Sequence, residues 1–375
     1  IYFIYLVYMI YNFDSLSEDL ILSIFQILTY PYCNYFHQVN KTVYNITGKF
    51  LFHSFLTDNQ SNNTHPEYQL HDFINSVKEG STIFLERCVY SLTLPLIIKP
   101  IRLIGVQEGF RKTVIKLINS IKIINTCICF ENIFFTPYHT NDYDNNSYGF
   151  IYGFKNSRIM INNCYFGHIN LPAIYVESSY LSVTKSYFTS YQGIYILHCK
   201  KPIIQDNLFT DCSHPLYINN CENILIHSNF FKRSSFDPIY MLYSTGNIIL
   251  NSINFSKKNG IRLVKNSNTF IIKNSITNSS GNGICITDSD NITLEYNTFE
   301  NNKGNGIQIE NIYDDGHFLI QCNSIQKNLL NGLIATGSNL LVQKNIIEDN
   351  NNTGITIIGC KGSIKNNTTN NNNLY

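Results

Sequence analysis

The chain has 375 residues, of which 44% are hydrophobic and 14% are charged, and its net charge is +1. This balance excludes a general basic field, so we expect no binding to nucleic acid or to an anionic membrane. The eleven cysteines include no Cys-x-x-Cys pair. We therefore expect reduced thiols, no metal site and no cofactor, in a cytoplasmic or nuclear protein.

The first eleven residues, IYFIYLVYMIY, are apolar and aromatic. A membrane-spanning helix needs about 20 apolar residues. A signal peptide needs a basic start and a cleavage site with small residues. The segment meets none of these conditions, so we predict neither a membrane span nor a signal peptide.

Residues 12–50 have the pattern of short helices. Apolar residues recur at helical spacing at Leu16, Leu20, Ile24, Phe25 and Leu28. Asp14 or Ser15 can cap the start of this helix, and Pro31 ends it. A few short helices bury too little apolar surface to form a stable core by themselves. The segment is therefore expected either to dock on a partner or to cap the domain that follows. Residues 51–70 contain the polar stretch TDNQSNNTHP and are predicted to be a linker.

A periodic pattern runs through residues 71–375. A small residue followed by an apolar pair recurs at Gly193, Pro215, Pro238, Gly260, Gly283, Gly306, Gly332 and Gly354. Asparagine recurs with the same period at Asn207, Asn229, Asn251, Asn274, Asn297, Asn323, Asn345 and Asn367. Both markers advance by 22 or 23 residues, except for one shared step of 26. Two markers that shift together indicate one structural unit per period, with an insertion in one unit.

One unit, Gly283–Asn305, predicts three short strands. Ile284 and Ile286 alternate with polar residues, and so do Ile292 and Leu294. Three strands joined by turns form one coil, and the next coil lies parallel to it at about 4.8 Å. The predicted fold is mainly β, a right-handed parallel β-helix over residues 71–375. We interpret the recurring Asn and Gly as turn residues, Asn because it tolerates left-handed backbone and caps exposed backbone groups.

This repeat resembles the pectin-lyase-like β-helix superfamily, in particular the carbohydrate-binding and sugar-hydrolase type repeats that also occur in NosD-like proteins. The resemblance covers about three quarters of the chain and concerns the fold. The same solenoid carries lyases, hydrolases and inert binding arms, so the resemblance leaves the function open.

The N-terminal segment resembles an F-box, in the residues Leu16, Asp19, Leu20, Ile24, Phe25, Leu28, Val39, Asn40, Lys41 and Tyr44. It departs from the pattern at Ser17, where Pro is common, and in lacking a Trp after Val-Asn-Lys. The resemblance implies binding of a Skp1-type adaptor through Leu16, Leu20, Ile24, Phe25, Leu28 and Val39. The chain would then be the non-enzymatic substrate receptor of a cullin-based ubiquitin ligase, a monomer within that complex whose β-helix binds an unidentified target protein.

The alternative is a β-helical carbohydrate-active enzyme, either a polysaccharide lyase or a glycoside hydrolase, or a sugar-binding module with a helical cap. Its weak catalytic candidates are Asp314, Asp315 and His317, which lie on the insertion of the 26-residue unit. Asp288 and Asp290 are more simply explained as turn residues. Arg262 and Lys265 lie on an outward strand, where they face solvent or meet an acidic sugar or a protein.

Overall fold

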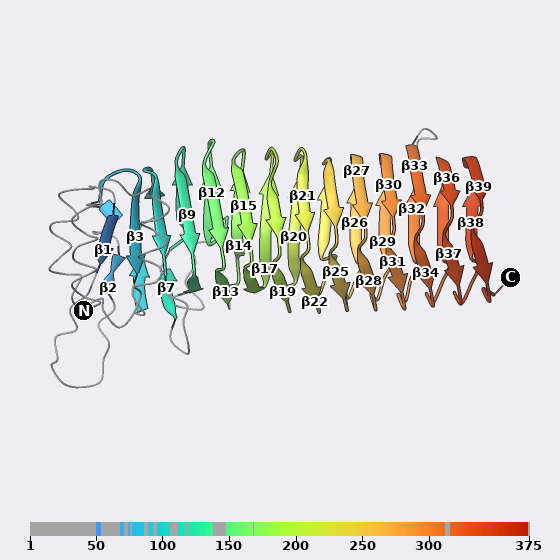
Figure 1. Cartoon of the computed structure of the whole chain (residues 1–375), viewed down its shortest axis with the longest axis horizontal. Coiled ribbons are helices and arrows are strands. Elements are labelled where there is room, and N and C mark those ends of the chain that lie inside the picture. The colour runs from blue at the N-terminus through green and yellow to red at the C-terminus, as the bar shows by residue number, and fades with distance from the viewer. Residues whose placement is uncertain are drawn as a thin grey trace, which may run out of the picture.

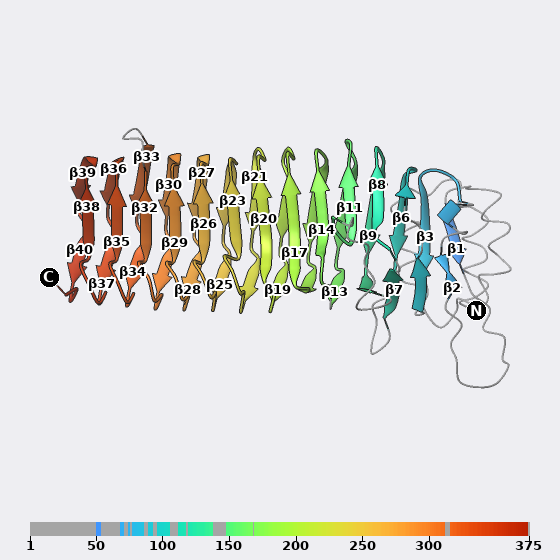
Figure 2. The same cartoon turned by 180° about the vertical axis from the view of Figure 1, so that it is seen from behind.

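The computed structural model describes residues 50–53, 68–70, 74–75, 77–85, 89–92, 96–105, 112–117, 119–137, 148–167, 169–311 and 316–373. Forty β-strands lie in this part of the chain, and they form one continuous stack of coils. The stack is a long rod with its first and last strands at opposite ends (Figure 1), and the view from behind shows the same regular rows (Figure 2).

Each regular coil adds one strand to each of three parallel sheets, here named A, B and C. Sheet A has fourteen strands: β1 Phe50–His53, β3 Ser81–Leu85, β6 Ile101–Ile104, β9 Cys127–Glu131, β12 Arg158–Asn162, β15 Tyr180–Thr184, β18 Ile203–Gln205, β21 Ile224–His227, β24 Gly246–Ile249, β27 Ser267–Ile272, β30 Asp290–Glu295, β33 Gly316–Gln321, β36 Ser338–Gln343 and β39 Lys361–Lys365.

Sheet B also has fourteen strands: β2 Tyr68–Gln69, β4 Val89–Leu92, β7 Thr113–Leu117, β10 Ile133–Pro137, β13 Tyr165–Gly167, β16 Tyr187–Thr189, β19 Leu208–Thr210, β22 Phe230–Lys232, β25 Ser252–Asn254, β28 Ser275–Thr277, β31 Thr298–Glu300, β34 Ser324–Gln326, β37 Ile346–Glu348 and β40 Thr368–Asn370. Sheet C has twelve: β5 Leu96–Ile97, β8 Ile121–Ile124, β11 Ile151–Phe154, β14 Pro172–Glu177, β17 Gln192–Leu197, β20 His214–Asn219, β23 Ile239–Leu242, β26 Ile261–Val264, β29 Ile284–Thr287, β32 Ile307–Glu310, β35 Leu333–Thr336 and β38 Ile355–Ile358.

The core is a set of ladders made by equivalent residues of successive coils. Strand residues alternate between buried and partly exposed, as the period of two requires. In sheet B the inward Phe166, Phe188, Phe209 and Phe231 stack with ring centroids 4.9, 4.7 and 4.9 Å apart. These rings are fully buried. The mainly β solenoid predicted from the repeat is therefore confirmed.

The recurring asparagines form a buried ladder at the turn from sheet A to sheet B. In this ladder Asn251 accepts hydrogen bonds from the backbone N–H of Asn229 at 2.9 Å and from its side-chain amide at 3.0 Å. Asn251 itself donates to the carbonyl oxygen of Ile226, in the preceding coil, at 2.9 Å. Capping, as predicted, is thus part of the role of these residues.

The left-handed conformation belongs to a different residue than predicted. The residue immediately before each ladder asparagine has positive φ, for example Leu250 at 57° and Tyr296 at 55°, and the ladder asparagines do not. These bulky residues adopt a backbone that costs them energy. The buried side-chain amide of the following asparagine fixes the turn, so the position before it tolerates almost any residue type.

The recurring glycines lie where coils approach closely, at the entry to sheet C. A Cβ atom on Gly283 would lie 2.6 Å from the carbonyl oxygen of Gly306, and one on Gly306 would lie 2.7 Å from that of Gly332. Neither glycine has positive φ. The glycines therefore serve close backbone packing rather than a left-handed turn.

The stack of coils begins earlier in the chain than the sequence predicts. β1 pairs with β3, and β2 pairs with β4, so two strands lie within or at the edge of the predicted linker, residues 51–70. The predicted helices of residues 12–50, with Leu16, Leu20, Ile24, Phe25, Leu28 and Val39, lie outside the described residues and stay a prediction. In the described part of the chain, no helix has the length and apolar character to cross a membrane.

Candidate functional site

A row of five tyrosines runs along the outer face of sheet C. Tyr152, Tyr175, Tyr195, Tyr217 and Tyr240 occupy the same outward position in five consecutive coils and are paired in register. We call these five residues the tyrosine row. Their backbones are fixed by the parallel ladder, so the ring spacing is set by the coil repeat of about 4.8 Å.

The rings of the tyrosine row follow one another closely. The centroid of Tyr195 lies 5.1 Å from that of Tyr217, which lies 5.5 Å from that of Tyr240. Each ring is partly exposed. Burial against the sheet, and secondarily the neighbouring Tyr217, raises the pKa of Tyr195 to about 12. The hydroxyl group of Tyr195 therefore stays protonated at neutral pH and can donate a hydrogen bond to a ligand.

A cation lies at each end of the tyrosine row. Lys122 pairs in register with Tyr152 at one end, and its side chain is exposed. At the other end Arg262 pairs in register with Tyr240 and lies over its ring, with the guanidinium carbon 5.7 Å from the centroid. Arg262, predicted to lie on an outward strand, therefore extends the tyrosine row as its next member.

A pair of titratable side chains flanks the row where the chain enters sheet C. His214 and Asp237 stand at equivalent positions of adjacent coils, three residues before Tyr217 and Tyr240. The ring of His214 stacks on that of Phe236, with centroids 4.1 Å apart. Its Nδ1 atom is buried and has no hydrogen-bond partner among the described residues.

Burial moves both groups toward their neutral forms. Burial lowers the pKa of His214, against the smaller opposing effect of Asp237. Burial also raises the pKa of Asp237, although a hydrogen bond from the backbone N–H of Asn259 at 2.7 Å and the charge of Arg262 act the other way. An imidazole shifted toward its neutral form, near a carboxyl group shifted toward its protonated form, is an arrangement suited to proton transfer.

We expect Asp237 to make the folded protein less stable as the pH rises. Below the ordinary pKa of 3.8 the carboxyl group is protonated in both states. Above it the unfolded chain releases the proton first, because the folded-state pKa is raised. Stability is therefore lost as the pH rises from the ordinary pKa through the raised one.

The variant Asp237→Asn isolates this effect, because its amide oxygen can still accept the bond from Asn259. Asparagine is the residue at the equivalent position of the next coils, as Asn259 and Asn282 show. In thermal unfolding, the variant should gain stability over the wild type, and the gain should grow as the pH rises above about 4. A gain that is constant with pH would contradict the raised pKa.

His317, the catalytic candidate that the structure describes, is not part of this face. His317 lies on β33 of sheet A, where its Nδ1 is 3.1 Å from Oδ1 of Asp290, and both side chains are more than half exposed. The pKa of Asp290 lies below its ordinary value. Partial burial acts to raise this pKa, but the hydrogen bonds from His317 lower it. Asp314 and Asp315 lie outside the described residues. Lys265 lies at the turn after sheet C, over the ring of Tyr243 at 5.4 Å.

The tyrosine row was missed in the sequence, although its signal is there. Tyrosine occupies the same place in the repeat in AIYV, GIYI, PLYI and PIYM. The interpretation of the repeat used only the small residue and the apolar pair. A tyrosine that recurs at the coil period must form a row on one face. In the described residues no group of three or more His, Cys, Asp or Glu side chains is arranged to hold a metal ion.

The family comparison agrees with this architecture. The family model described as "Right handed beta helix region" matches residues 138–235, 192–313 and 239–375, which together cover more than half of the chain. The chain belongs to the right-handed β-helix family. No curated protein sequence matches this β-helix protein.

Several solved structures resemble this β-helix protein at low identity. The A-module of the mannuronan C-5 epimerase AlgE4 from Azotobacter vinelandii is 12% identical, with a TM-score of 0.42, over 79% of this chain and 88% of that one. DFA-IIIase from Arthrobacter chlorophenolicus A6 is 13% identical, with a TM-score of 0.48, over 84% and 90%. A double mutant of the periplasmic alginate epimerase AlgG is 12% identical, with a TM-score of 0.47, over 78% and 75%.

These comparisons correct the main functional prediction. The prediction of a non-enzymatic ubiquitin-ligase receptor is wrong, because the family match is to the right-handed β-helix region alone and begins at residue 138. The F-box pattern drew on residues that lie outside the described part of the chain, and the described part consists of β-helix coils.

Proposed function

We propose that this protein is a carbohydrate-active β-helix that binds an extended polysaccharide along the tyrosine row. The observation that carries the proposal is the in-register repeat of five outward tyrosines on one flat sheet. A surface with a repeat of one residue type suits a polymer with a repeat of its own. A compact small-molecule ligand would instead favour an enclosed pocket.

Sugar rings fit such a row for two physical reasons. The C–H faces of a pyranose ring are apolar and pack on aromatic faces, while the tyrosine hydroxyl groups bond to the sugar hydroxyls. The sheet backbone holds every ring in place, so little side-chain entropy is lost on binding.

The charged residues favour an acidic polysaccharide. Arg262 follows the last tyrosine and Lys122 precedes the first, so a cation stands at each end of the tyrosine row. A guanidinium group matches the planar carboxylate of a uronic acid. Glu177, near Tyr175, is the acidic residue whose charge acts on the row itself.

The pair of His214 and Asp237 near Arg262 favours β-elimination over hydrolysis as the chemistry. Neutral His214 would take the proton from the carbon next to the uronate carboxylate, whose charge Arg262 neutralises. The C–H electron pair becomes a carbon–carbon double bond, the glycosidic C–O bond breaks, and the leaving oxygen takes the proton of Asp237. Hydrolysis uses two carboxylates. Here the charge of one carboxyl group, Asp237, acts on His214, and the charges of Arg262 and Lys258 act on Asp237.

The double variant Tyr195→Ala/Tyr217→Ala tests the binding proposal. Polygalacturonate binding, measured by isothermal titration calorimetry, should weaken by about tenfold, since each aromatic contact contributes about 0.5–1.5 kcal/mol. The matched control is Tyr187→Ala, which removes a partly exposed tyrosine of sheet B whose ring lies tilted against that of Tyr165, with centroids 4.9 Å apart. An equal loss in the control would overturn the proposal, and so would unchanged binding in the double variant.

The chemistry has a separate readout. An elimination produces an unsaturated uronate that absorbs in the ultraviolet, whereas hydrolysis yields new reducing ends without that absorbance. We expect the ultraviolet signal with wild type and its loss in His214→Ala. Reducing ends without absorbance would leave the tyrosine row as the binding face and reject the elimination.

A further inference from the structure

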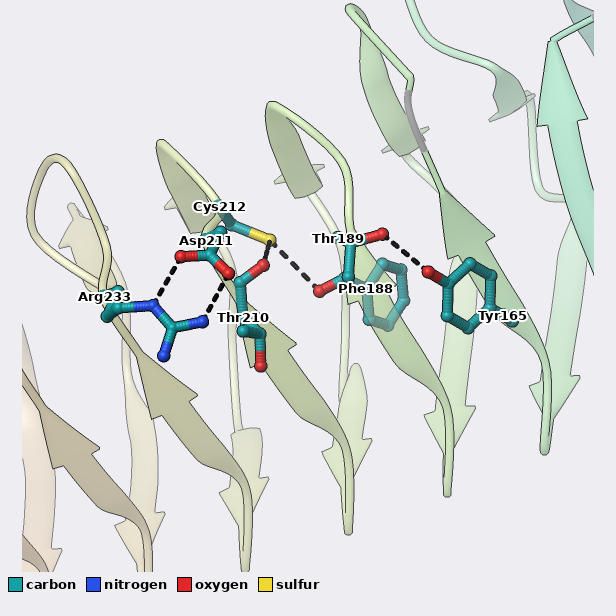
Figure 3. A network of polar contacts seen from close by, with 7 residues as sticks. All are labelled: Tyr165, Phe188, Thr189, Thr210, Asp211, Cys212 and Arg233. Atoms are coloured by element: carbon teal, nitrogen blue, oxygen red, sulfur yellow. Dashed lines mark hydrogen bonds and ion pairs between the residues drawn. The ribbon is translucent and has the colours of Figure 1, made fainter.

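Arg158 differs from the other arginines that the structure describes. Arg102 forms an ion pair with Glu131 at 2.6 Å. Arg233 binds both carboxylate oxygens of Asp211 at 2.6 Å, and Figure 3 shows the two side chains facing each other. Arg262 belongs to the tyrosine row and lies close to Asp237. Arg158 is exposed and stacks on the ring of Tyr180 at 4.8 Å, and no carboxylate pairs with it in the described part of the chain.

Arg158 lines a shallow groove of about 550 Å³ at the corner between sheets C and A. Three consecutive coils contribute to the groove, with Arg158 from the first, Ser178 and Tyr180 from the second, and His198 and Lys200 from the third. No carboxylate is among the residues that line it. Positive and hydrogen-bonding side chains therefore converge from several sides on a space without an internal counter-charge.

The two cationic side chains and the histidine can all act as donors. The side-chain amide of Asn220 donates to Nδ1 of His198 at 2.9 Å, so the ring proton of a neutral His198 lies on Nε2. The Nζ atom of Lys200 lies 4.0 Å from a carboxylate oxygen of Glu222, and both side chains are well exposed, at 82% and 61%. Such a loose surface pair holds the ammonium group weakly.

We propose that this groove binds a tetrahedral oxyanion, the sulfate or phosphate group of an esterified glycan or the free ion. Arg158 and Lys200 supply charge from coils on opposite sides of Tyr180, and His198 adds a hydrogen-bond donor. A tetrahedral anion accepts bonds in several directions, which suits donors that converge from three coils. The site is separate from the tyrosine row, and its existence does not depend on the proposed function.

Dextran sulfate, with unmodified dextran as its neutral counterpart, tests the site in calorimetric titrations. We expect the full chain to bind dextran sulfate and not dextran. Arg158→Gln and Lys200→Gln should each weaken binding by about tenfold, the size expected for a lost charge-assisted hydrogen bond. Arg158→Lys, which keeps the charge, should lose less than Arg158→Gln.

The control is Lys273→Gln, which removes one exposed charge at the turn from sheet A to sheet B. Unchanged binding in the groove variants, or an equal loss in the control, would overturn the site. Competition by inorganic sulfate or phosphate would assign it to the free ion, and its absence to the ester on the polymer. Loss of dextran sulfate binding in Tyr195→Ala/Tyr217→Ala, with both groove variants unaffected, would reject the groove and leave the tyrosine row standing.

Discussion

Asn251→Ala is expected to lower the free energy of unfolding by about 3 kcal/mol. The side chain of Asn251 is 1% exposed and bonds to the coils on both sides of it. Alanine would leave the backbone N–H of Asn229 and the carbonyl oxygen of Ile226 without these partners. Each buried polar group left unsatisfied costs about 1–3 kcal/mol, and water cannot replace the lost amide inside the packed stack.

The matched control lies four residues away in the same coil. Asn247 is partly exposed on the outer face of sheet A, so Asn247→Ala should change stability by about 0.5 kcal/mol or less. Urea unfolding followed by circular dichroism compares the two variants with wild type. Similar midpoints for Asn251→Ala and Asn247→Ala would mean that the ladder asparagines do not stabilise the coils.

Phe209→Ala should be the most damaging single truncation in the core, at about 3–5 kcal/mol. The ring is fully buried between Phe188 and Phe231, at centroid distances of 4.7 and 4.9 Å. The parallel ladder fixes the backbones on both sides, so neighbouring rings cannot collapse into the cavity that alanine leaves. Thermal unfolding would measure the loss.

Phe230→Ala is the control for this truncation, because Phe230 is 38% exposed and neighbours Phe231 on the same strand. It removes the same number of atoms from the outer face and should cost far less. Phe209→Leu, which refills part of the cavity, should fall between wild type and Phe209→Ala. If the inner and outer truncations cost the same, the stacked rings are not the source of the core's stability.

The sequence predicts the strands and their inward residues well, because both follow from periodicity. The alternation of Ile284 and Ile286 with polar residues appears in β29, where both are fully buried. The shared step of 26 residues also appears in the structure, as the separation between the paired Ile307 and Leu333. Periods of 2 and of 22 or 23 residues can be read without knowing any contact.

The local turn geometry and the functional face could not be derived in the same way. Positive φ falls on Leu250, Tyr296 and Phe255, residue types that avoid it in isolation, because the coils impose it. The tyrosine row depends on register between coils, which a single repeat does not reveal. His214 and Asp237 come together only because Leu216 pairs with Ile239. The pairing of Asp290 with His317 likewise depends on the 26-residue coil.

The in-register pairing of adjacent coils has a consequence for how the chain folds. A strand pairs with residues only 22 to 26 positions away along most of the rod, as Ile284 with Ile307 and Ile307 with Leu333 illustrate. The entropy lost in closing each such loop is therefore nearly the same wherever the coil lies, and it does not grow with the length of the protein. Once a few coils have nucleated, later ones can add at a constant cost, so assembly can keep pace with synthesis on the ribosome.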